Sequence, residues 1–242
     1  ANGSKVYFPK RYYPASIPFF GRSTPNIPHY DWQIDTALIN QYYQFTDDPN
    51  EADFALLYIF TPEGNWGYSD VQEGGTGYVP ISLQYNDYTA TQSRSVSIAG
   101  GDAKESFSNR SYLGKSDYSY NQQDMLQVIQ TKQLMGDKPV ILLIQAARPF
   151  IPAEIEPYAD ALLLGFGIKD QAYLDILCGN AEPYGLLPMQ LPKDMLTVEN
   201  QMEDLPHDME CYIDADSHTY DFAFGMNWSG IIQDARVKKY QP

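Results

Sequence analysis

The sequence predicts an α/β fold in which a mainly parallel sheet carries helices on both faces. Two apolar runs, Phe54–Phe60 and Val140–Ile144, are continuous rather than alternating, which is typical of strands buried on both faces of a parallel sheet. A third run, Ala161–Leu164, follows after Pro152–Pro157, a crossover with room for little more than a short helix. Strands that alternate with helical patterns in this way indicate an α/β sandwich.

The start of the chain has a different character. A short strand is predicted at Lys5–Phe8, and residues 9–32 are rich in Pro, Tyr and Phe without periodicity. Since disordered linkers are poor in aromatic residues, we expect this loop to lie on a neighbouring surface. A helix over Asp35–Tyr43 begins with a capping carboxylate. We therefore expect an extended arm, residues 1–34, that packs on a neighbouring domain or chain, and a sandwich domain, residues 35–242.

A long insertion with little periodicity separates the first buried strand from the next helix. It covers Thr61–Tyr120 and is rich in Gly, Ser, Asn and Tyr. Ordinary connections have a median of roughly 4–6 residues, so a loop of this size is typically functional. Short strands are predicted within it at Val79–Tyr85 and Ser95–Ala99.

Two helices are predicted after the insertion. Asn121 and Asp124 have the spacing of a capping box, and Gly136 ends the first helix. Asp170 can cap the second helix, and Gly179 follows it as a left-handed cap. The apolar face of the first helix is expected to comprise Met125, Leu126, Val128, Ile129 and Leu134.

Charge and hydropathy exclude several classes of partner. The 242 residues carry a formal net charge of −15, and phosphate binding needs clustered Lys and Arg. We therefore expect neither nucleic acid nor a membrane surface as a partner. No apolar run reaches the roughly 18 residues of a membrane span.

No metal site and no cofactor is predicted. His29, His207 and His218 are far apart and lack ligand spacing. The acidic residues near the C-terminus lack the regular pattern of a calcium loop and are better explained as a solvated face. Cys178 and Cys211 leave two alternatives, a disulfide between them or small buried thiols.

Carboxylates in the insertion are the remaining chemical groups. Glycoside hydrolysis needs two carboxyl groups across the scissile bond, although each loop acid alone is better explained by solvent exposure. The candidates are Glu63, Asp70, Glu73, Asp87, Asp102 and Glu105.

Three ordered stretches resemble the second domain of glycoside hydrolase family 3. They are KPVILLIQAARP, ADALLLGFGIKDQAYLDILCGNAEPYGLLPMQLP and YDFAFGMNW, within a match from about Ala52 to Trp228. The sequence departs from the family pattern at Ala147, where glycine is usual, and at Ile168-Lys169-Asp170. The matching positions are Arg148-Pro149, Ala159-Asp160-Ala161, Gly179, Pro183, Gly185, Leu187-Pro188 and Phe224-Gly225.

This resemblance implies an α/β sandwich that packs against an N-terminal TIM-like barrel. In the family, the barrel carries an Asp nucleophile and the sandwich supplies a general acid/base Glu. The chain is then the downstream half of an exo-acting, retaining β-glucosidase, periplasmic or secreted, whose substrate is a β-glucoside or oligosaccharide. A homodimer formed through residues 9–32 is compatible with this function. The alternative is a non-catalytic carbohydrate-binding or dimerisation module of the same fold.

The resemblance also suggests the acid/base residue. The family places it in a loop before the helix that precedes the KPV strand, followed closely by Asp or Asn and often by Arg. Glu105 fits this form, with Asn109 and Arg110 placed to hold or tune it; their alternative role is ordinary loop hydrogen bonding. Glu73 and Glu63 are the next candidates.

Three aromatic residues of the insertion are candidates for the aglycone side of the site. Trp66, Tyr68 and Tyr78 lie among glycines, and aromatic faces stack on sugar rings. Aromatic residues flanked by glycine also serve simply to pin long loops, so both roles stay open.

Overall fold

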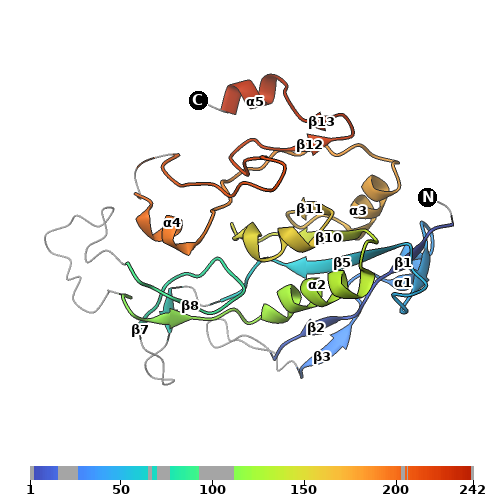
Figure 1. Ribbon diagram of the computed structural model, residues 1–242, viewed down its shortest axis with the longest axis horizontal. Coiled ribbons are helices and arrows are strands. Elements are labelled where there is room, and N and C mark those ends of the chain that lie inside the picture. Colours follow the sequence, from blue (N-terminus) through green and yellow to red (C-terminus); the bar gives the residue numbers. More distant parts are fainter. Residues whose placement is uncertain are drawn as a thin grey trace, which may run out of the picture.

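The computed structural model describes residues 3–15, 27–64, 67–69, 77–92, 112–202, 205 and 207–240. A five-stranded parallel sheet lies at its centre (Figure 1). The strand order is β11-β10-β5-β1-β4. The strands are β1 (Lys5–Tyr7), β4 (Gln44–Thr46), β5 (Phe54–Phe60), β10 (Val140–Gln145) and β11 (Ala161–Gly165).

The strand order changes direction between β1 and β5. The chain passes from β1 outward to β4, returns to the other side of β1 for β5, and then adds β10 and β11 in sequence. The register from Val140↔Ala55 to Gln145↔Phe60 brings the carboxyl ends of β5 and β10 level with each other. Residues that follow β5 and β10 therefore start from the same edge of the sheet, beside the point of reversal.

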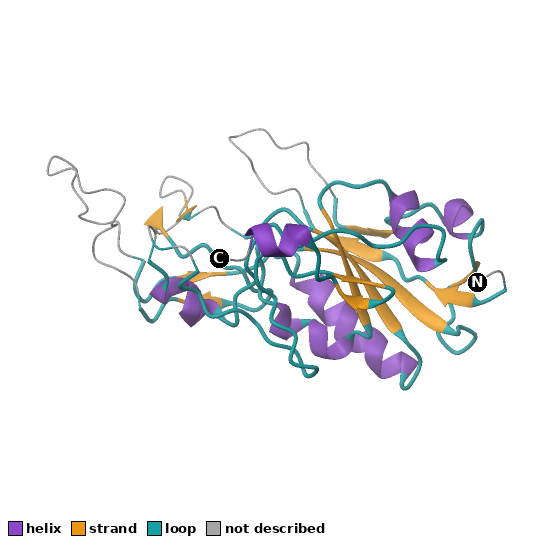
Figure 2. Ribbon diagram, turned by 90° about the horizontal axis from the view of Figure 1, so that it is seen from above, coloured by secondary structure: helices purple, strands orange, loops and turns teal. Residues whose placement is uncertain are grey.

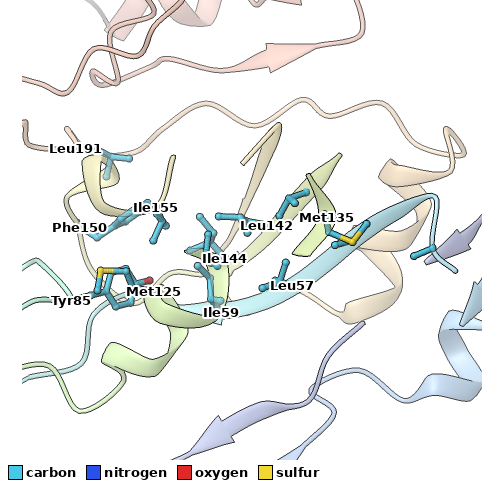
Figure 3. Packing of buried hydrophobic residues seen from close by; sticks show 14 residues of the cluster. Leu57, Ile59, Tyr85, Met125, Met135, Leu142, Ile144, Phe150, Ile155 and Leu191 are labelled. Atoms are coloured by element: carbon cyan, nitrogen blue, oxygen red, sulfur yellow. The ribbon is translucent and has the colours of Figure 1, made fainter. Parts of the chain in front are cut away.

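One face of the sheet is covered by α2 (Gln122–Met135). Leu57 and Ile59 of β5 point to this face and pack with Met125, Val128 and Met135 of the helix (Figure 3). Burying a side chain of this size contributes about 1.5–3 kcal/mol relative to exposure. The cluster continues past the strand ends through Tyr85, Phe150, Ile155 and Leu191.

The opposite face is covered by α1 (Thr36–Ile39) and α3 (Asp170–Leu177). Leu56 of β5 and Leu143 of β10 pack there with Tyr173 and Leu174 of α3 and with Ile39 of α1. Helices thus lie on both sides of the strands (Figure 2), which confirms the predicted α/β sandwich. Because both faces are covered, neighbouring residues of β5 are equally apolar.

Short elements complete the described structure. Four antiparallel pairs join two- and three-residue strands outside the main sheet. Two 3₁₀ turns and two short helices lie in the C-terminal half, and among the described residues no helix is both long and apolar enough to span a membrane. The pairs are β2 (Arg11–Tyr13) with β3 (His29–Asp31), β6 (Tyr68–Ser69) with β7 (Gly77–Tyr78), β8 (Tyr88–Thr89) with β9 (Ser116–Asp117), and β12 (Met226–Asn227) with β13 (Gly230–Ile231). The turns and helices are η2 (Pro152–Glu154), η3 (Glu156–Tyr158), α4 (Met195–Asn200) and α5 (Ala235–Tyr240).

The N-terminal segment contributes directly to the sheet. The predicted strand at Lys5–Phe8 is confirmed as β1, which lies between β4 and β5 and so brings part of residues 1–34 into the sandwich. The expected loop 9–32 contains the β2–β3 hairpin. Its expected packing on a neighbouring domain or chain stays a prediction.

Several local expectations are corrected. Asp35 caps α1 through the Ala37 amide, but the helix ends at Ile39 because the chain turns to enter β4. The strand expected at Val79–Tyr85 is absent from those described residues, whose backbone bends, and Ser95–Ala99 lies outside the described part.

The helix predictions are otherwise close. Gly136 follows α2 with φ of 59°, but Leu134 is 61% exposed and Met135 takes the buried position. Asp170 is the first residue of α3 rather than its cap, and Gly179 has φ of 82° as expected. Cys178 and Cys211 are both free thiols, so the disulfide alternative is wrong.

Candidate active site at the carboxyl edge of the sheet

Charged side chains gather where the strand order reverses. Arg11 follows β1, Glu63 follows β5, and Arg148 follows β10. In open α/β sheets, ligands bind outside the carboxyl ends of the strands at such a reversal. The topology therefore places these groups where a site is expected.

A buried ion pair is the centre of this cluster. The Arg11 guanidinium donates from Nε to Asp124 Oδ1 and from Nη2 to Asp124 Oδ2, each at 2.9 Å. Arg11 is 5% exposed and Asp124 is 1% exposed. The guanidinium also lies over the rings of Phe60, at 4.3 Å, and Tyr13, at 5.0 Å. The bidentate pair joins the β2–β3 hairpin to the first turn of α2 and the end of β5.

Asn121 extends the network to the start of the insertion. Its side-chain amide donates to Asp124 Oδ2 at 2.9 Å and to the Phe60 carbonyl at 3.1 Å. Its Oδ1 accepts from the Glu63 amide at 2.7 Å and from the Ser119 hydroxyl at 2.8 Å. The predicted capping box is wrong, because these tertiary partners occupy the side chains of Asn121 and Asp124.

Glu63 is half-buried beside both arginines. Burial raises the pKa of its carboxyl group; the charge of Asp124 adds to this rise, whereas Arg11 and Arg148 oppose it. Burial also lowers the pKa of Arg148, against the charges of Glu63 and Asp117. A carboxyl group whose pKa is raised by burial has the property that a general acid requires.

Because its pKa is raised in the folded protein, ionised Glu63 lowers the free energy of unfolding at neutral pH. The folded protein binds more protons than the unfolded chain between the ordinary glutamate pKa, about 4.3, and the folded value. The free energy of unfolding therefore falls as pH rises through that interval. We expect Glu63→Gln to unfold at higher urea than the wild type at pH 7, with the difference closing below about pH 4. Urea titrations across pH, with Glu182→Gln at an exposed position as control, measure this; a difference independent of pH would contradict it.

The returning strand of the insertion packs tightly against Glu63. Asp117 of β9 is fully buried, and its Oδ2 accepts from the Ser82 amide at 3.4 Å. A Cβ at Gly64 would lie only 2.7 Å from the same oxygen, so glycine is required for this approach. The Tyr120 amide donates to the Glu63 carbonyl at 2.6 Å. Both ends of the insertion are thus fixed at the carboxyl edge.

A family model described as the glycosyl hydrolase family 3 C-terminal domain matches residues 44–228. The chain belongs to this family. Its described residues contain no group of three or more His, Cys, Asp or Glu side chains arranged to hold a metal ion.

Curated relatives of this family 3 domain are named β-glucosidases. Beta-glucosidase C of Emericella nidulans is 42% identical over 78 residues, which cover 32% of this chain and 13% of that protein. The probable beta-glucosidase C of Aspergillus flavus is 41% identical over 70 residues, 29% of this chain and 11% of the relative. The periplasmic beta-glucosidase/beta-xylosidase of Dickeya chrysanthemi is 33% identical over 70 residues, again 29% and 11%. The matched segments therefore span only a small part of each relative.

The structure describes only some of the predicted site residues. Tyr68 and Tyr78 face each other across the β6–β7 pair, with ring centroids 5.4 Å apart and planes at 80°, and both are exposed. Their role toward a sugar stays a prediction. Glu63 lies in the charged cluster described above. The other candidates lie outside the described residues: Glu105, Glu73, Trp66, Asn109 and Arg110.

The sequence does not mark the remaining members of the cluster as site residues. Arg148 belongs to an Arg-Pro motif, and Asp124 has the spacing of a helix-capping residue. Arg11 is separated from Asp124 by 113 positions, and no local pattern marks it. Its position four residues after Tyr7, the last residue of β1, is the one available signal, since residues following parallel strands often line sites.

Proposed function

We propose that this family 3 domain supplies the general acid/base of an exo-acting β-glucosidase that removes terminal β-D-glucosyl residues with retention. The match to the family model over residues 44–228 carries the proposal, and the names of the aligned relatives support the substrate class. A TIM-like barrel domain, the proposed partner, provides the Asp nucleophile.

The proposed reaction proceeds by double displacement. The acid/base residue protonates the glycosidic oxygen while the barrel Asp attacks the anomeric carbon and the aglycone leaves. The same residue, now a carboxylate, takes a proton from water as the water oxygen attacks the anomeric carbon. This step breaks the bond to Asp, releases β-glucose and restores both carboxyl groups to their starting states.

Glu105 is the proposed acid/base, with Asn109 and Arg110 holding or tuning its carboxyl group. Glu73 and Glu63 are the alternatives. The raised pKa of Glu63 is compatible with acid catalysis, but its backbone is tied to Asn121 and Tyr120 at the base of the insertion. The family pattern of a Glu followed closely by Asn and Arg favours Glu105.

The surroundings of the site are proposed on the same basis. Trp66, Tyr68 and Tyr78 are proposed to line the aglycone side, and the exposed pair Tyr68 and Tyr78 offers aromatic surface for stacking. A periplasmic or secreted location is proposed from the oligosaccharide substrate and from the relative described as periplasmic. A homodimer formed through residues 9–32 remains part of the proposal.

The anomer released first tests this function. The complete natural protein that contains this chain is incubated with an aryl β-glucoside, and the product is followed by proton NMR before mutarotation. We expect β-glucose to appear first, because two displacements restore the configuration. Initial release of α-glucose, or no hydrolysis of β-glucosides, would contradict the proposal.

A further inference from the structure

The middle of the insertion leaves and rejoins the described fold through one short stem. Strands β8 and β9 pair Tyr88 with Asp117 and Thr89 with Ser116. The Ala90 amide donates to the Lys115 carbonyl at 3.0 Å, and the Gly114 amide donates to the Ala90 carbonyl at 2.9 Å. The stretch 93–111, which contains Glu105, follows this stem in sequence and returns to it.

A buried carboxylate from a distant segment meets this stem. Glu199 in α4 is 9% exposed, and its Oε2 accepts from the Gln92 amide at 2.9 Å across 107 positions. Gln92 is the last described residue before 93–111. Glu199 therefore fixes the backbone at Gln92, directly before the stretch 93–111.

The second oxygen of Glu199 lies beside Tyr88. Burial raises the pKa of the Tyr88 hydroxyl, and interaction with the Glu199 carboxylate raises it further, so this hydroxyl stays protonated. Glu199 Oε1 and Tyr88 Oη are both buried, and neither forms a hydrogen bond among the described residues. The Tyr88 hydroxyl can donate and Glu199 Oε1 can accept, and the two groups interact electrostatically. Together Gln92 and Tyr88 connect the carboxylate to the outgoing strand of the stem.

The short helix that carries Glu199 is itself seated on the insertion. Asp194 caps α4 by accepting from the Thr197 amide at 2.8 Å. Met195 is buried, and its sulfur lies 3.3 Å from the Leu83 amide. These contacts place helix α4 beside the insertion, and both α4 and β8 are labelled in Figure 1.

Burying a carboxylate costs free energy unless it is paired and hydrogen-bonded. A leucine at position 199 would fill similar volume without that cost, but it would leave the Gln92 amide without this acceptor. The contribution of Glu199 is therefore the hydrogen bond that ties α4 to the backbone at Gln92.

We infer that Glu199 is a positioning residue that clamps the β8–β9 stem and thereby sets where the stretch 93–111 leaves the fold. Its consequence for catalysis rests on the proposed function, in which Glu105 of that stretch is the acid/base. The hydrogen bond from the Gln92 amide to Glu199 is a property of the described residues and can be measured separately.

Hydrogen exchange followed by mass spectrometry tests the clamp directly in this chain. We expect Glu199→Ala to speed exchange of the Gln92 amide and the stem by about 10–100-fold, because a hydrogen bond to a charged group is lost. Exchange in α2 should be unchanged. The matched control is Glu210→Ala, an exposed glutamate paired with Lys193, and Glu199→Gln should retain most of the protection.

Activity of the complete natural protein gives the second readout. Glu199→Ala should lower kcat by about 10–100-fold with little change in KM, as expected for a misplaced catalytic group, and Glu199→Gln should restore most of kcat. If stem exchange matches the wild type or rises only together with that of α2, the clamp is overturned whatever the activity. If the stem opens selectively but kcat is unchanged, the clamp stands and the placement of the acid/base in 93–111 fails.

Discussion

Glu105→Gln is expected to lower kcat/KM for an alkyl β-glucoside by about 10²–10⁴-fold, the range typical of a lost general acid. An alkoxide is a poor leaving group and needs the proton, whereas an activated phenolate departs without it. The loss on an aryl glucoside with an acidic phenol should therefore be much smaller. Steady-state kinetics across aryl glucosides of graded leaving-group pKa measure this dependence in the complete natural protein.

The same substitution at the other candidate positions is the matched control. If neither residue protonates the leaving group, Glu73→Gln and Glu63→Gln should each change kcat/KM by a similar factor for all substrates. A steep leaving-group dependence in Glu63→Gln, with a shallow one in Glu105→Gln, would transfer the acid/base role to Glu63. The raised pKa of Glu63 would then be its functional property.

Arg11→Met is expected to lower the free energy of unfolding by about 3–5 kcal/mol, because it leaves the buried Asp124 carboxylate without its cation. Urea unfolding of this chain measures the change. Arg11→Met combined with Asp124→Leu should recover most of the loss, since removing both charges removes the uncompensated burial.

An exposed ion pair provides the comparison. Lys5 and Glu51 pair at 3.0 Å with side chains 43% and 57% exposed. Pairs of this kind contribute roughly 0–1 kcal/mol, so Lys5→Met should have a small effect. Equal losses in Arg11→Met and Lys5→Met would show that the buried pair does not hold the carboxyl edge together.

The central strands could be predicted because burial on both faces leaves a continuous apolar run in the local sequence. In β5, Leu57 faces α2 and Leu56 faces α3, so a strand buried on both sides is apolar throughout and stands out in the sequence. The three residues of β1 carry no such signature. Their place in the sheet depends on pairing with β4 and β5, which the arm boundary at residue 34 did not anticipate.

The candidate site was harder to predict because distant contacts override local patterns. Asn121 and Asp124 have capping-box spacing, yet Asp124 is bound by Arg11 from 113 positions away and Asn121 by the Glu63 amide. Glu199 is likewise joined to Gln92 across 107 positions. Periodicity and capping rules describe neighbours in the chain, so only the folded arrangement reveals these pairs.

Azide rescue of Glu105→Gln is the most direct test of the claim that this domain supplies the acid/base of a retaining β-glucosidase. Once the acid/base carboxylate is missing, azide needs no general base and can attack the glycosyl enzyme in place of water. With an activated aryl glucoside, we predict that added azide raises the turnover of Glu105→Gln in the complete natural protein and yields β-glucosyl azide. No change in turnover with azide, or formation of the α-azide, would contradict the account.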